Sequence, residues 1–419
     1  MDRYPYDKPP QWWSSKPSRF WMRLWRPWRK WQQRRDYRVV DIEVRGLERV
    51  RAAMDRGHGV LVTPNHAGHA DCFLLFEALE RLPQPPQVMT AWQVFELLPR
   101  LQQLVYRHHG CFSINREAND LTAFRHSVRV LEKSSAPLVI FPEGEVYHLN
   151  DLVTDFRDGT LAIAMSAVRR GGRPVACFPC ALKYFFVDDP TAELAAVMKR
   201  LDARLDLSSG RGDSLAQRLR RFTAVAIAQR ERQYLDDVAG NDDAGDDESG
   251  DKLGASTSEN DSASLAARLG RLKATLIERL EQRLKITPQS TFLAERVKRI
   301  RQSIVERRSE TTDVDERKRL DDDLERAFVA VQLYSYRPEY LDGTPSLERL
   351  AETIDKYEED FLGVRSANIR GRKRSVIAFG EPLVLDRAGS RDDVPRLGEE
   401  LRRRVQALID ALNAERAGH

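Results

Sequence analysis

The 419-residue sequence lacks several features that would assign it at once to a common class of protein. Its four cysteines, Cys72, Cys111, Cys177 and Cys180, are too few and too scattered for a disulfide framework, which favours a reducing compartment. No apolar run reaches the roughly 18 residues that a transmembrane helix needs. The N-terminus lacks the apolar core of a secretion signal, because its aromatic residues alternate with Arg and Pro. We therefore expect a cytoplasmic chain whose only contact with a membrane is peripheral.

A strong net charge is also absent. The formal charge is +4, so no attraction of the whole protein to nucleic acid follows, and 32% charged beside 41% hydrophobic residues indicates a soluble globular protein. No glycine-rich phosphate loop precedes a helix, which argues against nucleotide hydrolysis. The charge is unevenly distributed: residues 1–37 hold ten Lys/Arg against three Asp/Glu, and residues 236–251 hold eight acidic and no basic residues.

Residues 19–35 predict an amphipathic helix with a Trp-rich face. Its apolar arc contains Phe20, Trp21, Leu24, Trp25, Trp28 and Trp31. The opposite arc contains Arg19, Arg23, Arg26, Lys30 and Arg34. This pattern is typical of a helix lying in a bilayer interface, and the alternatives are a helix docked on the protein's own core or a basic aromatic arm for RNA. We favour the membrane surface, and Pro27 predicts either a kink or the start of a second helix.

Between residues 38 and 190, short apolar segments alternate with amphipathic ones. Strands are expected at 38–46, 59–63, 85–91, 110–116, 136–141 and 175–186. Helices are expected at 47–55, 72–80, 95–107, 119–133 and 159–168. This alternation predicts an α/β fold with a mixed sheet flanked by helices.

After about residue 190 the pattern becomes helical and charged. Residues 236–264 are rich in Asp, Gly, Ser and Asn and are expected to be disordered, whereas helices are expected at 192–235, 265–284, 293–308, 314–333 and 346–361. Strand-like and helical patterns return at 373–382 and 394–414. We therefore predict a membrane-associating segment (1–37), an α/β core (38–191), a long helical insertion (192–365) and a C-terminal strand and helix that complete the core (366–419).

The stretch Asn65–Asp71 stands at the end of the predicted strand 59–63 and before a helix. His66 followed by Asp71, an HxxxxD pattern, suits a general base and the carboxylate that fixes its tautomer. Alone the pair is weak evidence, because such short patterns recur by chance and Asp71 is also a candidate helix N-cap.

Three further features follow in order: Gly110-x-Phe112-x-Ile114-x-Arg116, Phe141-Pro142-Glu143-Gly144, and Pro179 within residues 178–184. Together with Asn65–Asp71, they resemble the four sequence blocks of the glycerolipid acyltransferases, with the lysophosphatidate (1-acylglycerol-3-phosphate) acyltransferases as the nearest members. Residues 379–382 resemble that family's closing strand and turn. The resemblance covers about residues 38–190 and 370–415 and leaves out the insertion.

The resemblance implies roles for seven residues. His66 would be the base and Asp71 its orienting acid, whereas the substrate-binding set comprises Asn65, Arg116, Glu143, Gly144 and Lys183. Arg116 stands where the family binds the acceptor's phosphate, and a guanidinium can meet a phosphate with two hydrogen bonds. Glu143 would accept from acceptor hydroxyls or pair with Arg116, and Gly144 would permit a close backbone approach. His69 is expected to be a loop residue.

The third block departs from the family's pattern. The family often continues it with Thr and Arg, whereas Glu145-Val146-Tyr147-His148 stand here. An added acid and a missing Arg weaken the case for a simple phosphate-bearing acceptor, and a different lysolipid or a glycolipid is the alternative. Lys183 and Arg157 are the candidate replacements for the missing positive charge.

The resemblance implies an O-acyltransferase that moves a fatty acyl group from acyl-CoA or acyl carrier protein to a lysophospholipid-like hydroxyl at the cytoplasmic face of a membrane. It implies neither a cofactor nor a metal, and nucleic acid is not an expected partner. Cys177 and Cys180 form a CxxC pattern, but they lie inside a predicted strand, which disfavours redox or zinc chemistry. The alternative from another class is a catalytically silent, lipid-binding scaffold with the same fold.

Overall fold

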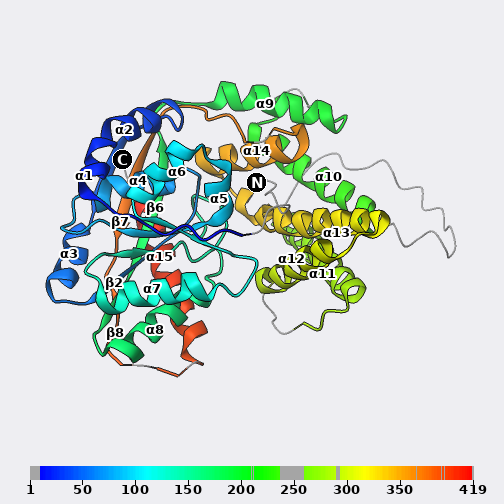
Figure 1. Ribbon diagram of the computed structural model, residues 1–419. Coiled ribbons are helices and arrows are strands. Elements are labelled where there is room, and N and C mark those ends of the chain that lie inside the picture. Colours follow the sequence, from blue (N-terminus) through cyan, green and yellow to red (C-terminus); the bar gives the residue numbers. More distant parts are fainter. Residues whose placement is uncertain are drawn as a thin grey trace. The chain divides into compact units, whose positions relative to one another are not determined.

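The computed structural model describes residues 10–208, 210, 212–235, 259–288, 293–364, 366–387, 389–390 and 392–417. The described residues divide into two compact units (Figure 1). One unit comprises the described part of Arg3–Pro190 and Ile369–His419, and the other comprises the described part of Thr191–Asn368. Each unit is described by itself.

The first unit is built on a mixed sheet, which in the described residues has eight strands and confirms the α/β expectation. The strands are β1 (Val39–Arg45), β2 (Gly59–Pro64), β3 (Gln87–Ala91), β4 (Cys111–Ile114), β5 (Leu138–Val139), β6 (Val175–Phe186), β7 (Lys373–Phe379) and β8 (Leu383–Leu385). Their order is β1-β7-β6-β2-β5-β3-β4, with β8 also paired to β6. The pairs of β6 with β7 and β8 are antiparallel, whereas the other pairs are parallel.

Helices cover both faces of this sheet, so its strands are apolar on both sides. One face carries α3 (Leu47–Asp55) and α4 (Asp71–Leu79); the other carries α7 (Leu121–Lys133), α8 (Gly159–Gly171) and α15 (Asp393–Ala417) (Figure 1). Along β2, Val60 and Val62 pack in the first layer, whereas Leu61 packs in the second. The near-continuous apolar sequence of β2 and β6 is explained by this double burial.

The parallel arrangement brings the ends of β2, β4 and β5 to one edge of the sheet. β2 ends at Pro64, β4 at Ile114 and β5 at Val139. The three sequence blocks that follow these strands are therefore neighbours, as expected at the carboxyl edge of parallel strands.

Two of the expected elements differ in detail. The single helix expected at 95–107 is two helices, α5 (Trp92–Leu97) and α6 (Arg100–His108), because Pro99 interrupts the pattern. The strand expected at 136–141 pairs only at Leu138–Val139, and β8 was not expected. The extent of β5 and the presence of β8 depend on the strands with which they pair, and the sequence pattern of one segment does not contain that information.

The N-terminal segment forms α1 (Arg19–Leu24) and α2 (Arg26–Arg35), with Pro27 in the first turn of α2. The two helices dock on the unit through a third face that neither expected arc contains: Met22, Arg29 and Gln33 are buried. Arg29 pairs with Glu80 at 2.7 Å, and its Nη1 lies 2.7 Å from Nε2 of His109. Gln33 donates to the carbonyl of Phe73 in α4.

The Trp-rich face points away from this contact. Phe20 is 68% exposed and Trp31 is 49% exposed. The ring of Trp21 stacks on His108 of α6, and α6 itself exposes Leu101 and Leu104. Among the described residues, no helix combines the length and the apolar character needed to cross a bilayer.

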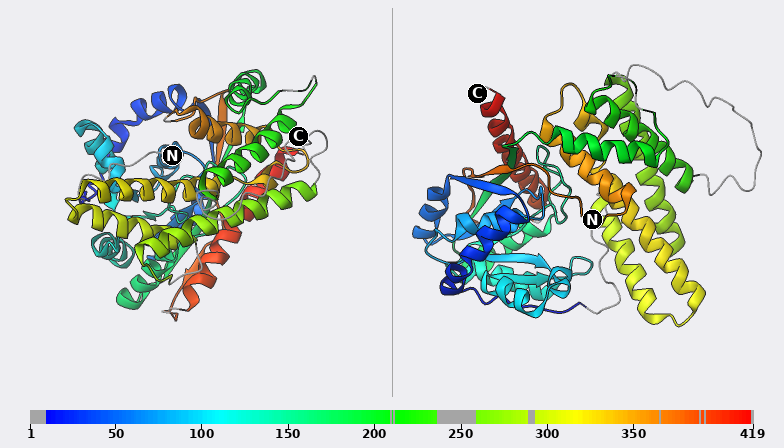
Figure 2. Two further views of the ribbon diagram at one scale, coloured as in Figure 1. Left: turned by 90° about the vertical axis from the view of Figure 1, so that its right-hand side faces the viewer. Right: turned by 90° about the horizontal axis from the view of Figure 1, so that it is seen from above.

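The second unit is helical: α9 (Thr191–Arg204), α10 (Leu215–Leu235), α11 (Glu259–Leu284), α12 (Leu293–Glu310), α13 (Val314–Gln332) and α14 (Leu347–Leu362). Helices α11, α12 and α13 run side by side (Figure 2). Their contact is built on the leucine stripe, since Leu269, Leu272, Leu276, Leu280 and Leu284 are buried.

The expectation of disorder at 236–264 was wrong for its last part. Helix α11 begins at Glu259, ahead of the expected start at 265. Once a long apolar stripe is packed, the helix can extend through a polar first turn whose own composition gives no helical signal. Residues 236–258 lie outside the described residues.

Candidate active site

His66 and Asp71 meet at the carboxyl edge of β2. His66 lies in the loop after β2, Asp71 is the first residue of α4, and His66 Nδ1 stands 2.9 Å from Asp71 Oδ2. The Asp71 side chain is fully buried, whereas that of His66 is 20% exposed. An ionised carboxylate only accepts, so the proton lies on Nδ1 and the Nε2 lone pair is left to act as a base. This is the geometry that the sequence predicts for a base and its orienting acid.

A tyrosine that the sequence analysis missed completes the surroundings of Asp71. Tyr184 of β6 donates its hydroxyl to Asp71 Oδ1 at 2.5 Å, and the backbone N–H of Gly68 donates to Oδ2 at 2.9 Å. Burial, together with the adjacent Asp71 charge, raises the pKa of the Tyr184 phenol well above its usual value, so it stays a donor. Tyr184 is 113 positions away in sequence, and only the pairing of β6 with its neighbours brings it here.

Glu143 braces the loop that carries His66. Its Oε1 accepts from the backbone N–H of His66 at 2.7 Å, and its Oε2 accepts from the N–H and the hydroxyl of Thr154 at 2.9 and 2.5 Å. Burial raises the pKa of this carboxyl group. Both oxygens therefore hold protein groups, and this geometry favours a positioning role over the expected contact with acceptor hydroxyls. The expected pair with Arg116 is formed by a different carboxylate.

Asn65 likewise serves the backbone. Its side chain is buried, donates from Nδ2 to the Leu182 carbonyl at 3.1 Å and accepts from the Leu182 N–H at 2.7 Å. These two hydrogen bonds extend the pairing of β2 with β6 beyond Pro64, the last residue of β2. The expected substrate contact of Asn65 is therefore not supported, because its amide is engaged in fixing the start of the His66 loop.

Arg116 and Gly144 form a second part of the site. Arg116 Nη1 donates to the Gly144 carbonyl at 2.5 Å and pairs with Glu145 Oε2 at 2.9 Å. Gly144 has φ +77°, and a Cβ there would lie 2.4 Å from Nε of Arg157. Glycine is favoured at this position because the residue takes the left-handed conformation and Arg157 packs directly over it.

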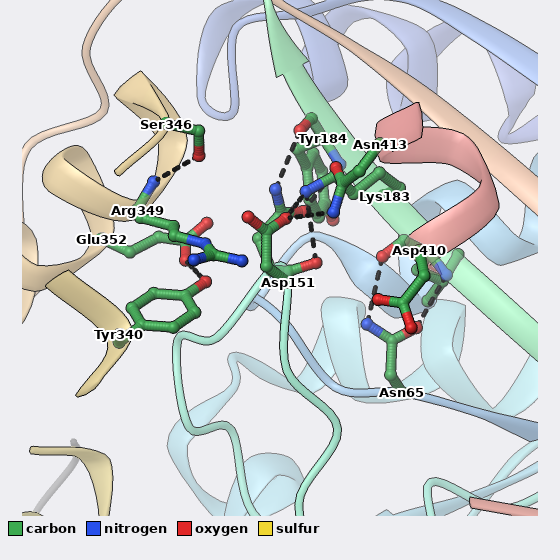
Figure 3. Close-up of polar contacts among 12 residues, drawn as sticks. Asn65, Asp151, Lys183, Tyr184, Tyr340, Ser346, Arg349, Glu352, Asp410 and Asn413 are labelled. Carbon is green, nitrogen blue, oxygen red and sulfur yellow. Dashed lines mark hydrogen bonds and ion pairs between the residues drawn. The ribbon is translucent and has the colours of Figure 1, made fainter. Parts of the chain in front are cut away.

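Lys183 lies outside this arrangement. Its side chain is 1% exposed and forms an ion pair with Asp151, which also accepts from Asn413 of α15 (Figure 3). The predicted substrate contact of Lys183 is not supported, since a buried ammonium with a buried carboxylate partner is structural. Lys183 and Tyr184 are adjacent in β6, so their side chains point to opposite sides of the strand, and only Tyr184 reaches Asp71.

Aromatic contacts complete the surroundings of His66. The ring of Phe141 stacks on the His66 ring with a centroid separation of 4.2 Å. His69 is exposed in the same loop, with its ring 5.3 Å from that of His148. His66, which contacts Asp71, is thus better placed than His69 to act as the base.

The CxxC pair lies in the middle of β6. Cys177 and Cys180 are both buried, and burial raises the pKa of the Cys177 thiol to about 12. Burial also raises the pKa of the Cys180 thiol. Such thiols are poor nucleophiles, which disfavours redox chemistry at this pair.

Comparison with known proteins agrees with this geometry. Residues 41–183, which contain His66, Asp71, Arg116 and Glu143, match a family model described as Acyltransferase. A glycerol-3-phosphate acyltransferase from Aeromonas hydrophila subsp. hydrophila is 30% identical over 148 residues, which is 34% of this chain. The match spans 18% of the relative's length. The part of the chain that contains His66, Asp71, Arg116 and Glu143 is therefore similar to an acyltransferase domain, including that of a glycerol-3-phosphate acyltransferase.

Proposed function

We propose that this protein is an O-acyltransferase of phospholipid biosynthesis. It transfers a fatty acyl group from acyl-CoA or acyl carrier protein to the free hydroxyl of a lysophospholipid-like acceptor. The observation that carries the proposal is the 2.9 Å contact between His66 Nδ1 and Asp71 Oδ2, which leaves Nε2 as a base in a partly exposed position. The name of the bacterial relative, a glycerol-3-phosphate acyltransferase, supports a glycerolipid acceptor.

In the proposed reaction, His66 Nε2 takes the proton of the acceptor hydroxyl as its oxygen attacks the thioester carbonyl carbon. The Asp71 carboxylate stabilises the imidazolium that forms, and Tyr184 holds the second carboxylate oxygen. Backbone N–H groups stabilise the oxyanion of the tetrahedral intermediate. The C–S bond then breaks, and the proton on His66 passes to the departing thiolate. The products are the ester and the free thiol, so no external oxidant, reductant or metal is required.

We further propose that the protein works as a peripheral protein on the cytoplasmic face of a membrane. Support comes from the exposed aromatic face of α1 and α2, which carries Phe20, Trp21 and Trp31. The exposed Leu101 and Leu104 of α6 lie on the helix that Trp21 contacts through His108. Apolar groups of this size on a docked, folded helix are typical of a surface that enters the bilayer interface.

The proposed activity is tested with purified full-length protein, labelled acyl-CoA or acyl carrier protein, and a panel of lysolipids. We expect transfer by the wild type and loss of roughly 1,000-fold or more in kcat for His66→Ala, because the general base is removed. His69→Ala is the matched control, since it removes an imidazole from the same loop. Equal rates for His66→Ala and wild type would reject the mechanism. Lipid binding without transfer by the wild type would favour the silent scaffold.

A further inference from the structure

The guanidinium expected to receive the acceptor's anionic group is already paired with a carboxylate of its own chain. Arg116 Nη1 lies 2.9 Å from Glu145 Oε2, and the two side chains are only 13% and 5% exposed. We propose, building on the acyl transfer proposed above, that Glu145 determines acceptor specificity. It occupies the anion position of Arg116 and excludes phosphate monoesters in favour of hydroxyl-bearing head groups without one.

The Arg116–Glu145 ion pair lies on the turn that also supports His66. Arg116 also donates to the carbonyl of Gly144, and Gly144 follows Glu143, whose carboxylate holds the backbone N–H of His66. Phe141, at the start of the same turn, stacks on the His66 ring. A head group that reaches Arg116 therefore lies against the turn that supports the base.

The charges around the turn do not favour a dianion. The positive groups are Arg116 and Arg157, which packs over Gly144. The acidic groups are Glu145, Glu143 and Asp71, of which Glu143 has a pKa raised by burial. A phosphate monoester carries between about 1.5 and 2 negative charges at neutral pH. The cluster thus has no surplus of positive charge with which to balance it.

Displacing Glu145 would also be unfavourable. A phosphate that took its place on Arg116 would break the ion pair of a nearly buried carboxylate, and breaking a buried ion pair is strongly destabilising. A head group that carries hydroxyls meets no such penalty, because it can donate to the Glu145 carboxylate while the ion pair stays intact. The geometry therefore discriminates by charge at this position.

The matched variants are Glu145→Gln, which removes the charge at constant shape, and Asp155→Asn, which removes an exposed charge from the nearby loop. The acceptors are lysophosphatidate and glycerol 3-phosphate as monoesters, lysophosphatidylglycerol as a diester, and a monoacylated glycosylglycerol as an uncharged head group. We expect the wild type to favour the last two in kcat/KM. Glu145→Gln should raise kcat/KM for the monoesters by about 10-fold or more, whereas Asp155→Asn should change it by less than about 2-fold.

Binding provides a measurement that needs no turnover. Calorimetric titration of the full-length protein with glycerol 3-phosphate should show affinity at least about tenfold higher for Glu145→Gln than for the wild type. Glu145→Thr serves as a second variant if the amide does not fold. A wild type that prefers monoesters, or variants that gain no affinity for them, would overturn the inference. If no acceptor is acylated by any variant but phosphate binding is gained, the acyl transfer fails and the exclusion by Glu145 stands.

Discussion

Tyr184 donates its phenolic hydrogen to the one oxygen of Asp71 that His66 does not use. The bond is 2.5 Å long, and it joins β6 to the first residue of α4. Asp71 thus receives three hydrogen bonds, from His66, Gly68 and Tyr184, and its carboxylate cannot rotate without breaking at least one of them. The orientation of His66 therefore depends on Tyr184, from the fourth sequence block, as well as on Asp71, from the first.

Tyr184→Phe should lower kcat by roughly 10- to 100-fold and leave the acceptor KM within about 3-fold, since a hydrogen bond to a charged group contributes about 1.5–3 kcal/mol. Steady-state kinetics at saturating donor measures both parameters. Tyr357→Phe is the control, because it removes another buried hydroxyl, bonded to Thr223, in the helical unit. A loss that is equal in both variants would indicate a general effect on stability and not a role at Asp71.

Lys183 provides a second test, because its expected contact with substrate and its observed burial predict different results. Lys183→Met leaves Asp151 buried without its partner and should lower the free energy of unfolding by about 3–5 kcal/mol. Lys183→Met combined with Asp151→Asn should recover much of this loss. We expect the acceptor KM of the double variant, measured with folded protein, to match the wild type. If the acceptor KM of a stable double variant rises more than about tenfold, Lys183 does contact the acceptor.

The sequence was sufficient for the positions of strands β1–β7 along the chain and for the neighbourhood of His66 and Asp71. These depend on patterns within one segment, such as the apolar run of β2 or the five-residue spacing at the start of α4. The two amide bonds of Asn65 and the hydroxyl of Tyr184 could not be predicted, since both depend on where β6 stands beside β2. Sequence reasoning therefore assigned Asn65 to the substrate, whereas its amide is engaged with the backbone.

The N-terminal helices show a different limit. The helical wheel separates an aromatic arc from a basic arc, and the structure uses a third arc, centred on Met22, Arg29 and Gln33, for docking. An arginine on a docking face gives no apolar signal. It is recognised only through its partners, Glu80 and His109, which come from other segments.

The stability of this docking should depend on pH through His109. Burial and the nearby Arg29 lower its pKa to about 4, whereas an unfolded histidine titrates near 6.5. Because the folded value is the lower one, the unfolded chain binds the proton more readily between these values. The contribution to stability is complete above about pH 6.5 and is lost as the pH falls towards 4, by about 3 kcal/mol in all.

We expect His109→Gln to lose less stability than the wild type between pH 7 and pH 4. Urea unfolding followed by Trp fluorescence measures this part of the chain, because six of the seven Trp residues lie between positions 12 and 31. His108→Gln is the control, since that neighbouring imidazole is more exposed and stacks on Trp21. Parallel pH profiles for the wild type and His109→Gln would contradict the assignment.

The exposed aromatic face should determine binding to membranes without affecting the docking of the helices. Replacing Phe20, Leu24 and Trp31 by Ser removes exposed apolar side chains, whereas Met22, Arg29 and Gln33 remain in place. Co-sedimentation with anionic vesicles should weaken by roughly tenfold for each residue replaced. Val314→Ser, at an exposed position of α13, is the control. The exposed Arg23 and Arg34 should make wild-type binding weaker at high salt, because attraction to anionic lipids is screened. If the triple variant binds vesicles as well as the wild type, the proposed membrane binding through this face is wrong. Binding to RNA in place of vesicles would also contradict it.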